Sequence, residues 1–132
     1  MSNLGGAAPY WSTFGYDEVG NRTSVVNHAG DGTTTTSAYP YDGSGSAGPH
    51  AVTKVATTSS ATGVGEVDST FAYDQAGNMV SRAVGGKDAQ SLTWDADGEL
   101  SGVKKTSSGA SQGTYVYSAD GDRLLRRQGK TP

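Results

Sequence analysis

A short motif that recurs along the 132-residue chain constrains its fold more than any other feature. The motif reads aromatic, any residue, aromatic, Asp, two variable residues, Gly, and then a polar residue. Its clearest copies are residues 14–22, FGYDEVGNR, and residues 71–79, FAYDQAGNM. Recurrence at a spacing of about 20–50 residues is typical of proteins built from stacked copies of one supersecondary unit. The chain is therefore predicted to be a repeat protein.

Three further copies of the motif are less regular. Residues 92–100, LTWDADGEL, and residues 115–123, YVYSADGDR, keep the spacing, although Ser118 takes the place of the aspartate in the second of these. Another copy begins as Tyr39-Pro40-Tyr41-Asp42 and then departs into a loop. The copies start near residues 14, 39, 71, 92 and 115.

The positions of these copies suggest how the chain is organised. Its length is that of one domain. We predict a lead-in of residues 1–13 and a repeat segment of residues 14–132. Residues 43–49 are mostly Gly and Ser, so we expect a flexible loop there.

Each copy has the chemistry of a β-hairpin. Side chains alternate along a strand, so two aromatics separated by one residue lie on the same face, which we expect to be buried. The aspartate can accept hydrogen bonds from backbone N–H groups just after it, and the glycine can take the positive φ that closes the loop. Turns are therefore predicted at Gly20, Gly77, Gly98 and Gly121. In the last copy the Ser118 hydroxyl is expected to cap the turn more weakly.

The residues that carry this pattern are assigned a structural role, and we assign no catalytic, cofactor-binding or metal-binding residue. The motif residues are Phe14, Tyr16, Asp17, Gly20, Asn21, Tyr39, Tyr41, Asp42, Phe71, Tyr73, Asp74, Gly77, Asn78, Leu92, Trp94, Asp95, Gly98, Tyr115, Tyr117, Gly121 and Arg123.

The residues between the motifs favour strands over helices. Thr, Ser and Val fill stretches such as residues 33–37 and 57–62, and these residue types favour strands and loops. We predict an all-β fold of about eight to ten short antiparallel strands, arranged as an open, twisted sheet of hairpins.

Charge and composition exclude several classes of function. A net charge of -3 provides no basic field for phosphate, so nucleic acid is not an expected partner. The basic residues near the C-terminus, Arg123, Arg126, Arg127 and Lys130, are interpreted as part of a solvated final strand. The absence of cysteine excludes disulfides and thiolate metal sites. The sequence has neither an apolar run of membrane-spanning length nor the pattern of a signal peptide at its start.

Other candidate chemistry is better explained by turns. The carboxylates of Asp95 and Asp97, and of Asp120 and Asp122, superficially resemble calcium loops, but the position that needs a glutamate is Thr106. Paired carboxylates for glycoside hydrolysis are no better supported, because turn chemistry already accounts for their spacing.

The histidines and the glycine-rich loop carry no stronger signal. His28 and His50 are the only histidines, and a packed, hydrogen-bonded role is expected for His50. Residues 43–48 have the glycine spacing of a dinucleotide loop but lack its strand-to-helix context. We expect no cofactor and no catalysis.

Several segments resemble the YD repeat of Rhs proteins, teneurins and the shell subunits of insecticidal toxin complexes. The repeat units are residues 16–22, YDEVGNR, and residues 73–78, YDQAGN. Residues 48–53, GPHAVT, 92–95, LTWD, and 121–126, GDRLLR, resemble segments that recur in actinobacterial Rhs proteins. The resemblance runs from about residue 10 to residue 127, which is most of the chain.

The resemblance implies a structural role. In the family, many more such repeats form a sheet that spirals into a hollow shell around a toxin or effector domain. It implies that the partners are the remaining YD repeats and the enclosed effector, in a secreted or cell-surface protein. Five repeats are too few to close a shell, and the family's self-cleaving segment has no counterpart here. We therefore expect an open piece of sheet that self-associates through its unpaired edges.

An alternative function belongs to a different class. Exposed aromatic side chains such as Trp11 and Trp94 would suit a β module that binds carbohydrate or a cell-surface protein.

Overall fold

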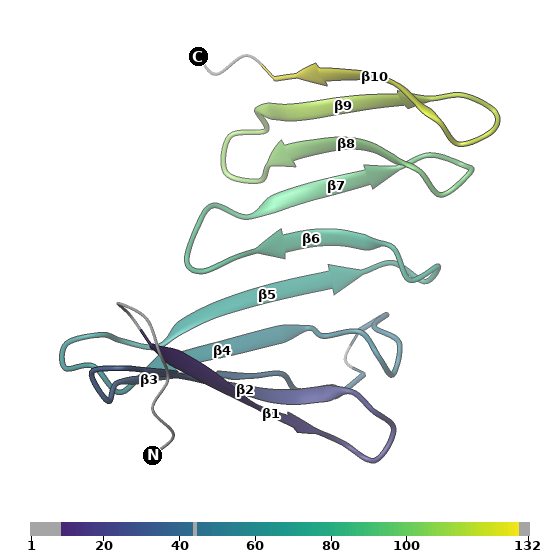
Figure 1. The fold of residues 1–132 in the computed structure, drawn as a ribbon. Coiled ribbons are helices and arrows are strands. Elements are labelled where there is room, and N and C mark those ends of the chain that lie inside the picture. Colours follow the sequence, from purple (N-terminus) through teal and green to yellow (C-terminus); the bar gives the residue numbers. More distant parts are fainter. Residues whose placement is uncertain (1–8, 44, 130–132) are drawn as a thin grey trace.

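The structure of the chain, a computed structural model, describes residues 9–43 and 45–129. These residues form a single open sheet of ten strands, in which each strand is hydrogen-bonded to the strands that precede and follow it in sequence (Figure 1). All the pairings are antiparallel. The described residues contain no helix. The predicted all-β sheet of antiparallel strands is thus confirmed.

The strands are short and evenly distributed. They are β1 (Tyr10–Tyr16), β2 (Arg22–Ala29), β3 (Thr34–Ala38), β4 (Lys54–Ser59), β5 (Val67–Tyr73), β6 (Met79–Ala83), β7 (Gln90–Trp94), β8 (Leu100–Lys105), β9 (Ser111–Tyr117) and β10 (Arg123–Gln128). The first strand begins at Tyr10, so part of the predicted lead-in belongs to the first hairpin. Residues 1–8 of that lead-in lie outside the described residues.

The motif turns lie at one end of the sheet, on the right in Figure 1. They join β1 to β2, β5 to β6, β7 to β8, and β9 to β10. The four predicted turn glycines have positive φ: Gly20 (89°), Gly77 (87°), Gly98 (81°) and Gly121 (83°). A β-bulge accompanies the second aromatic in all four of these hairpins, opposite Tyr16, Tyr73, Trp94 and Tyr117. The four predicted hairpins are confirmed.

The copy that starts at Tyr39 does not form such a hairpin. Strand β3 ends at Ala38, and the chain then runs through a long connection to Lys54 at the start of β4. Backbone hydrogen bonds hold both ends of this connection to neighbouring strands: Tyr39 N donates to Thr23 O (2.9 Å), and Phe71 N donates to Thr53 O (2.8 Å). The expected loop of residues 43–49 lies within it, and Ser44 lies outside the described residues.

Cross-strand register shows which residues share a face, because residues directly opposite each other point the same way. Phe14 lies opposite Val25, and the series of partners continues through Ser37 and Thr57 to Val67. Side chains alternate along β5, so Val67 and Phe71 lie on the same face. Phe14 and Phe71 therefore point to the same side of the sheet.

The same reasoning extends across the rest of the sheet. Phe71 lies opposite Arg82, which lies opposite Gln90, and Leu92 shares the face of Gln90. Leu92 in turn lies opposite Val103. Val103 is opposite Gly113, which shares its face with Tyr115. The first aromatic or apolar residue of each hairpin thus lies on one side of the sheet, as predicted. This side, which carries Phe14, Phe71, Leu92 and Tyr115, is called the motif face below.

The expectation that the motif face is buried is largely wrong. Only Leu92 (8% exposed) among the motif's aromatic and apolar residues is buried, whereas Phe14 is 51% exposed. Within residues 9–43 and 45–129, the other buried hydrophobic residues are Val25 and Val103, and both lie on the motif face. The physical reason is that a sheet buries a face only against a second layer, and the described chain has one layer (Figure 1).

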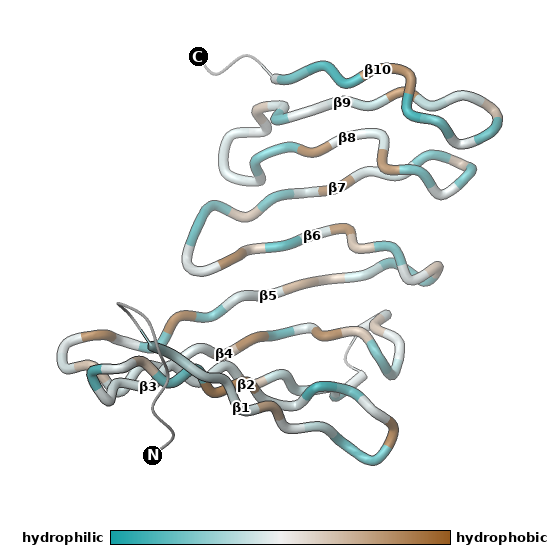
Figure 2. The backbone as a smooth tube through the Cα atoms, in the orientation of Figure 1, coloured by the Kyte–Doolittle hydropathy of each residue, from teal (hydrophilic) through white to brown (hydrophobic). Residues whose placement is uncertain are grey.

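The opposite face is mostly polar or small. It carries Thr36 opposite Thr58, Ala72 opposite Ser81, and Thr93 opposite Gly102. Apolar and polar segments accordingly alternate along several strands in Figure 2. One apolar and one polar face is the usual pattern of an antiparallel sheet that packs on one side.

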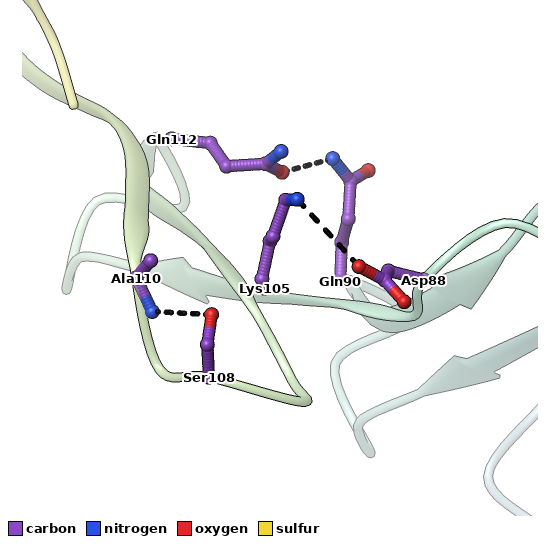
Figure 3. A network of polar contacts seen from close by, with 6 residues as sticks. All are labelled: Asp88, Gln90, Lys105, Ser108, Ala110 and Gln112. Carbon is purple, nitrogen blue, oxygen red and sulfur yellow. Dashed lines mark hydrogen bonds and ion pairs between the residues drawn. The ribbon is translucent and has the colours of Figure 1, made fainter. Parts of the chain in front are cut away.

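Polar side chains join the strands at the end opposite the motif turns. Arg82 Nε donates to Gln90 Oε1 (2.6 Å), and the Gln90 amide donates to Gln112 in β9. Figure 3 shows this contact beside the ion pair of Lys105 with Asp88 (3.5 Å) and the turn bond from Ala110 N to Ser108 Oγ (3.3 Å). The ion pair is exposed and contributes about 0–1 kcal/mol.

Candidate functional site

The first motif turn is closed by the side chain of its aspartate. Asp17 Oδ1 accepts hydrogen bonds from the backbone N–H of Val19 (3.1 Å) and of Asn21 (2.8 Å). Backbone bonds from Asp17 N to Asn21 O (2.9 Å) and from Gly20 N to Asp17 O (3.2 Å) complete the loop. The carboxylate of Asp17 and the backbone groups of Asp17, Gly20 and Asn21 thus all help to close this turn.

Two other turns repeat this arrangement. Asp74 Oδ1 accepts from Ala76 N and Asn78 N, both at 2.9 Å. Asp95 Oδ1 accepts from Asp97 N (3.1 Å) and Glu99 N (2.8 Å). The predicted capping role of the aspartate is confirmed in all three turns.

The fourth motif turn has Ser118 in the capping position. Its Oγ accepts a hydrogen bond from Asp122 N at 3.1 Å. This is one bond where the aspartates accept two, in agreement with the predicted weaker cap.

The asparagine after the turn glycine supports the aspartate. Asn21 Nδ2 donates to Asp17 Oδ2 (2.9 Å), and Asn78 Nδ2 donates to Asp74 Oδ2 (3.2 Å). Partial burial raises the pKa of the Asp17 carboxyl, but the bonds from Asn21, Val19 and Gly20 together hold that pKa below its usual value. For Asp74 the largest cause is the hydrogen bond from the backbone N–H of Asn78, which lowers the pKa of the carboxyl, and the side-chain amide of Asn78 lowers it further. Both carboxyl groups are therefore ionised acceptors at neutral pH.

The second aromatic of the motif connects its repeat to the strand that precedes the repeat. Tyr41 Oη donates to the carbonyl of Arg22 (3.3 Å). Trp94 Nε1 donates in the same way to the carbonyl of Met79 (2.8 Å). Arg22 and Met79 occupy the same motif position, directly after the asparagine. We call this contact the repeat joint.

The long connection makes a third joint. Tyr73 Oη donates to the carbonyl of Val52 (3.0 Å). Burial raises the pKa of the Tyr73 phenol, and the neighbouring Tyr41 adds to this effect. Tyr117, in the last hairpin, makes no such bond among the described residues.

The three joints share one register. Continuing the pairing of the adjacent strands places each accepting residue opposite the residue between the two aromatics. Arg22 thus falls opposite Pro40, Val52 opposite Ala72, and Met79 opposite Thr93. The joint is therefore a repeated geometry and not three unrelated contacts.

The long connection also folds back onto the first turn. His50 Nδ1 lies 2.6 Å from Asn21 Oδ1, and Asn21 Nδ2 is 3.3 Å from the carbonyl of Pro49. The predicted hydrogen bond of His50 is confirmed, but His50 is exposed and the prediction that it is packed is wrong. The Arg22 guanidinium lies over the Tyr39 ring, 4.5 Å from its centroid, so a cation–π contact joins the two repeats.

The two tryptophans of the binding-module alternative differ. Trp94 is half-buried, and its N–H is used in a repeat joint. Trp11 is 45% exposed and stacks on His28, with ring centroids 4.3 Å apart. Of these two tryptophans, only Trp11 offers an exposed ring.

The described residues contain no group of three or more His, Cys, Asp or Glu placed to hold a metal ion. His28 contacts Trp11 and lies 3.3 Å from Thr13 Oγ1. Within the same described ranges, no helix is long and apolar enough to cross a membrane.

Sequence reasoning missed the repeat joint, although a signal for it was present. The first aromatic position holds Phe, Tyr or Leu, whereas the second always holds Tyr or Trp. Tyr and Trp combine an apolar ring with a polar hydrogen-bond donor. Restriction to these two residue types indicates that the donor is used.

Comparison with known proteins assigns no role to this chain. No family model matches it, and no curated protein matches it. The contacts of the motif residues therefore carry the functional proposal.

Proposed function

We propose that the chain is a structural repeat segment of a secreted or cell-surface protein of the Rhs/YD-repeat type. In this role it contributes to a β-shell around an effector domain and catalyses no reaction of its own. Its partners are further YD repeats and the enclosed effector. The observation that carries the proposal is that the turn aspartates and the second aromatics of the motif make their hydrogen bonds within the sheet itself.

The first support is the fate of the motif's polar groups. In three turns the aspartate accepts two backbone hydrogen bonds. Three of the second aromatics donate to a carbonyl of a neighbouring segment. Groups used in this way are not available to a substrate, and their repetition favours a building unit over a single site.

The second support is the lack of a second layer. Three hydrophobic residues are buried in the described chain, which is a small core for its length. Repeat units of this kind bury their apolar faces mainly against neighbouring units. A longer array, curved around a cargo, would cover the motif face.

The complete natural protein provides the test. We expect its sequence around this segment to contain further copies of the motif and a separate effector domain. Electron microscopy of that protein should show a hollow shell, and limited proteolysis should leave the effector protected. A protein without further copies, or one whose effector is digested as fast as the isolated domain, would exclude the shell role.

Trp11 supports a second candidate, a β module that binds carbohydrate or protein. Its exposed ring lies on the edge strand β1, on the face of the sheet opposite to the motif face. Glycan-array binding by the chain that is lost in Trp11→Ala and kept in Leu124→Ala would favour this function. Leu124 is the control because it is also exposed but lies on the far strand.

A further inference from the structure

Each of the two outer strands carries a residue at one of the two motif positions that form a repeat joint. Strands β1 and β10 are each paired on one side only, at opposite ends of the sheet. Tyr16 on β1 is a second aromatic, the equivalent of Tyr41 and Trp94, and it is 62% exposed. Its hydroxyl makes no hydrogen bond among the described residues. Arg123 on β10 occupies the motif position of Arg22 and Met79, the accepting residues in two joints.

We propose that the β1 edge binds the β10 edge of a second copy of this chain through a repeat joint. In this contact Tyr16 donates to the carbonyl of Arg123 of the second copy. The inference rests on the proposed structural role, since it extends the joint between repeats to a joint between chains.

Strand direction fits this pairing. Each even-numbered strand in the sheet is followed by an antiparallel odd-numbered strand. Placing β1 next to β10 of another copy continues that alternation, and it brings the turn at Gly20 beside the turn at Gly121. All motif turns of the two copies then lie at one end of the extended sheet.

The pairing of residues in the three observed joints can be applied to the proposed contact between β1 and β10. It places Arg123 of the second copy opposite Gly15, the residue between Phe14 and Tyr16. Counting along both strands then places Arg126 opposite Ser12. Arg126 lies opposite Tyr115 in its own chain, so it lies on the motif face. Ser12 is two residues from Phe14 on β1, so it lies on the motif face as well. The faces of the two copies therefore match without any adjustment, whereas a slip of one residue would reverse them.

Charge and aromatic contacts add to the fit. Strand β1 carries no charged residue and is followed by Asp17 and Glu18, whereas β10 carries three arginines. Arg123 would approach Phe14 as Arg22 approaches Tyr39. The same register places Arg127 beside the exposed ring of Trp11. Arginine over an aromatic ring is a favourable contact.

The contact joins two different edges, so each copy that binds leaves one edge open for the next. Such heterologous contacts give open assemblies unless the rotation happens to close a ring. Sedimentation of the full chain from micromolar to millimolar concentration should show a mass that continues to rise beyond the dimer. A chain that stays monomeric over this range would overturn the proposal. It would leave the structural role intact, because that role concerns neighbours within one longer protein.

Two edge-blocked variants test the identity of the edges. Lysine on an edge strand opposes pairing, so Thr13→Lys with Phe14→Lys blocks β1, and Leu124→Lys with Leu125→Lys blocks β10. All four side chains are exposed, so both variants should keep the fold, as circular dichroism would verify. Each variant alone should be monomeric, and an equimolar mixture should form a dimer and nothing larger. Dimers of the β10-blocked variant alone would show β1 pairing with itself and would overturn the proposal.

A single-atom change tests the joint. Tyr16→Phe removes only the hydroxyl, and it should weaken association about fivefold, the equivalent of one ordinary hydrogen bond. Tyr10→Phe is the matched control, because Tyr10 lies on the same strand and the register gives its hydroxyl no equivalent role. Equal association constants for Tyr16→Phe and the unmodified chain would exclude this register.

Discussion

Tyr73 contributes both its ring and its hydroxyl to the sheet. Its ring lies half-buried on β5, and its hydroxyl donates to the carbonyl of Val52. Tyr73→Phe keeps the ring and removes the bond, so we expect it to lower the free energy of unfolding by about 1 kcal/mol. Urea denaturation followed by tryptophan fluorescence measures this change. Tyr10→Phe, at an exposed position, should leave the midpoint unchanged.

The ring of Tyr73 should contribute less to the free energy of unfolding than a fully buried ring does. Removing a fully buried aromatic side chain costs about 3–5 kcal/mol. Because Tyr73 is only half-buried, Tyr73→Ala should cost less than this, although more than Tyr73→Phe. A loss as large as that of a buried ring would show that the motif face is covered in solution.

The turn aspartates predict how stability depends on pH. Hydrogen bonds hold the pKa values of Asp17 and Asp74 below the usual value in the folded chain. A group of this kind stabilises the fold fully above its unfolded pKa of about 4, and this contribution is lost as the pH falls through the lower folded pKa. The urea midpoint should therefore fall as the pH is lowered from about 5 towards 2.

Asp74→Asn is expected to remove part of this pH dependence and to lower stability at neutral pH. Asp120→Asn is the matched control, because the Asp120 side chain makes no hydrogen bond among the described residues. If the two variants follow the same pH profile, the capping bonds do not determine the acid sensitivity.

At the scale of the hairpin, the turn glycine sets the conformation. Gly77 has φ of 87°, and an added Cβ would meet nothing within 4 Å. The cost of Gly77→Ala is thus backbone strain alone, and we expect about 1–2 kcal/mol from the left-handed conformation. Gly48→Ala provides the control, since that position also has open space but no positive φ. Thermal unfolding that shifts equally in the two variants would contradict this account.

Local chemistry made the hairpins predictable from sequence. Asp74 and Gly77 are close in sequence, and the bonds that close their turn involve only the residues between Asp74 and Asn78. The contact of His50 with Asn21 joins residues far apart in sequence, and nothing in the repeat pattern identified its partner. The exposure of Phe14 was also beyond sequence reasoning, because burial depends on whether another layer covers the motif face.

At the scale of the whole sheet, each strand that the structure describes contacts only the strands next to it in sequence. Stability in such an array is close to a sum of local terms and contacts between adjacent units. The buried residues Leu92 and Val103 lie opposite each other on β7 and β8, so they stabilise the C-terminal half of the sheet. The buried side chain of Val25 on β2 stabilises the first strands of the sheet in the same way.

This arrangement predicts that a destabilising substitution affects mainly the strands next to it. Leu92→Ala removes a buried side chain and should cost about 2–5 kcal/mol, because the cavity is only partly filled by relaxation. In a globular core that loss would be shared by the whole molecule, but here it should fall mainly on the strands next to β7. Hydrogen exchange read by peptide should therefore quicken in β6 to β9 and stay nearly unchanged in β1 to β3. Leu124→Ala, at an exposed position on β10, should change neither region. Equal acceleration in all strands would show that the ten strands unfold as one cooperative unit, as a closed domain does and an open repeat array does not.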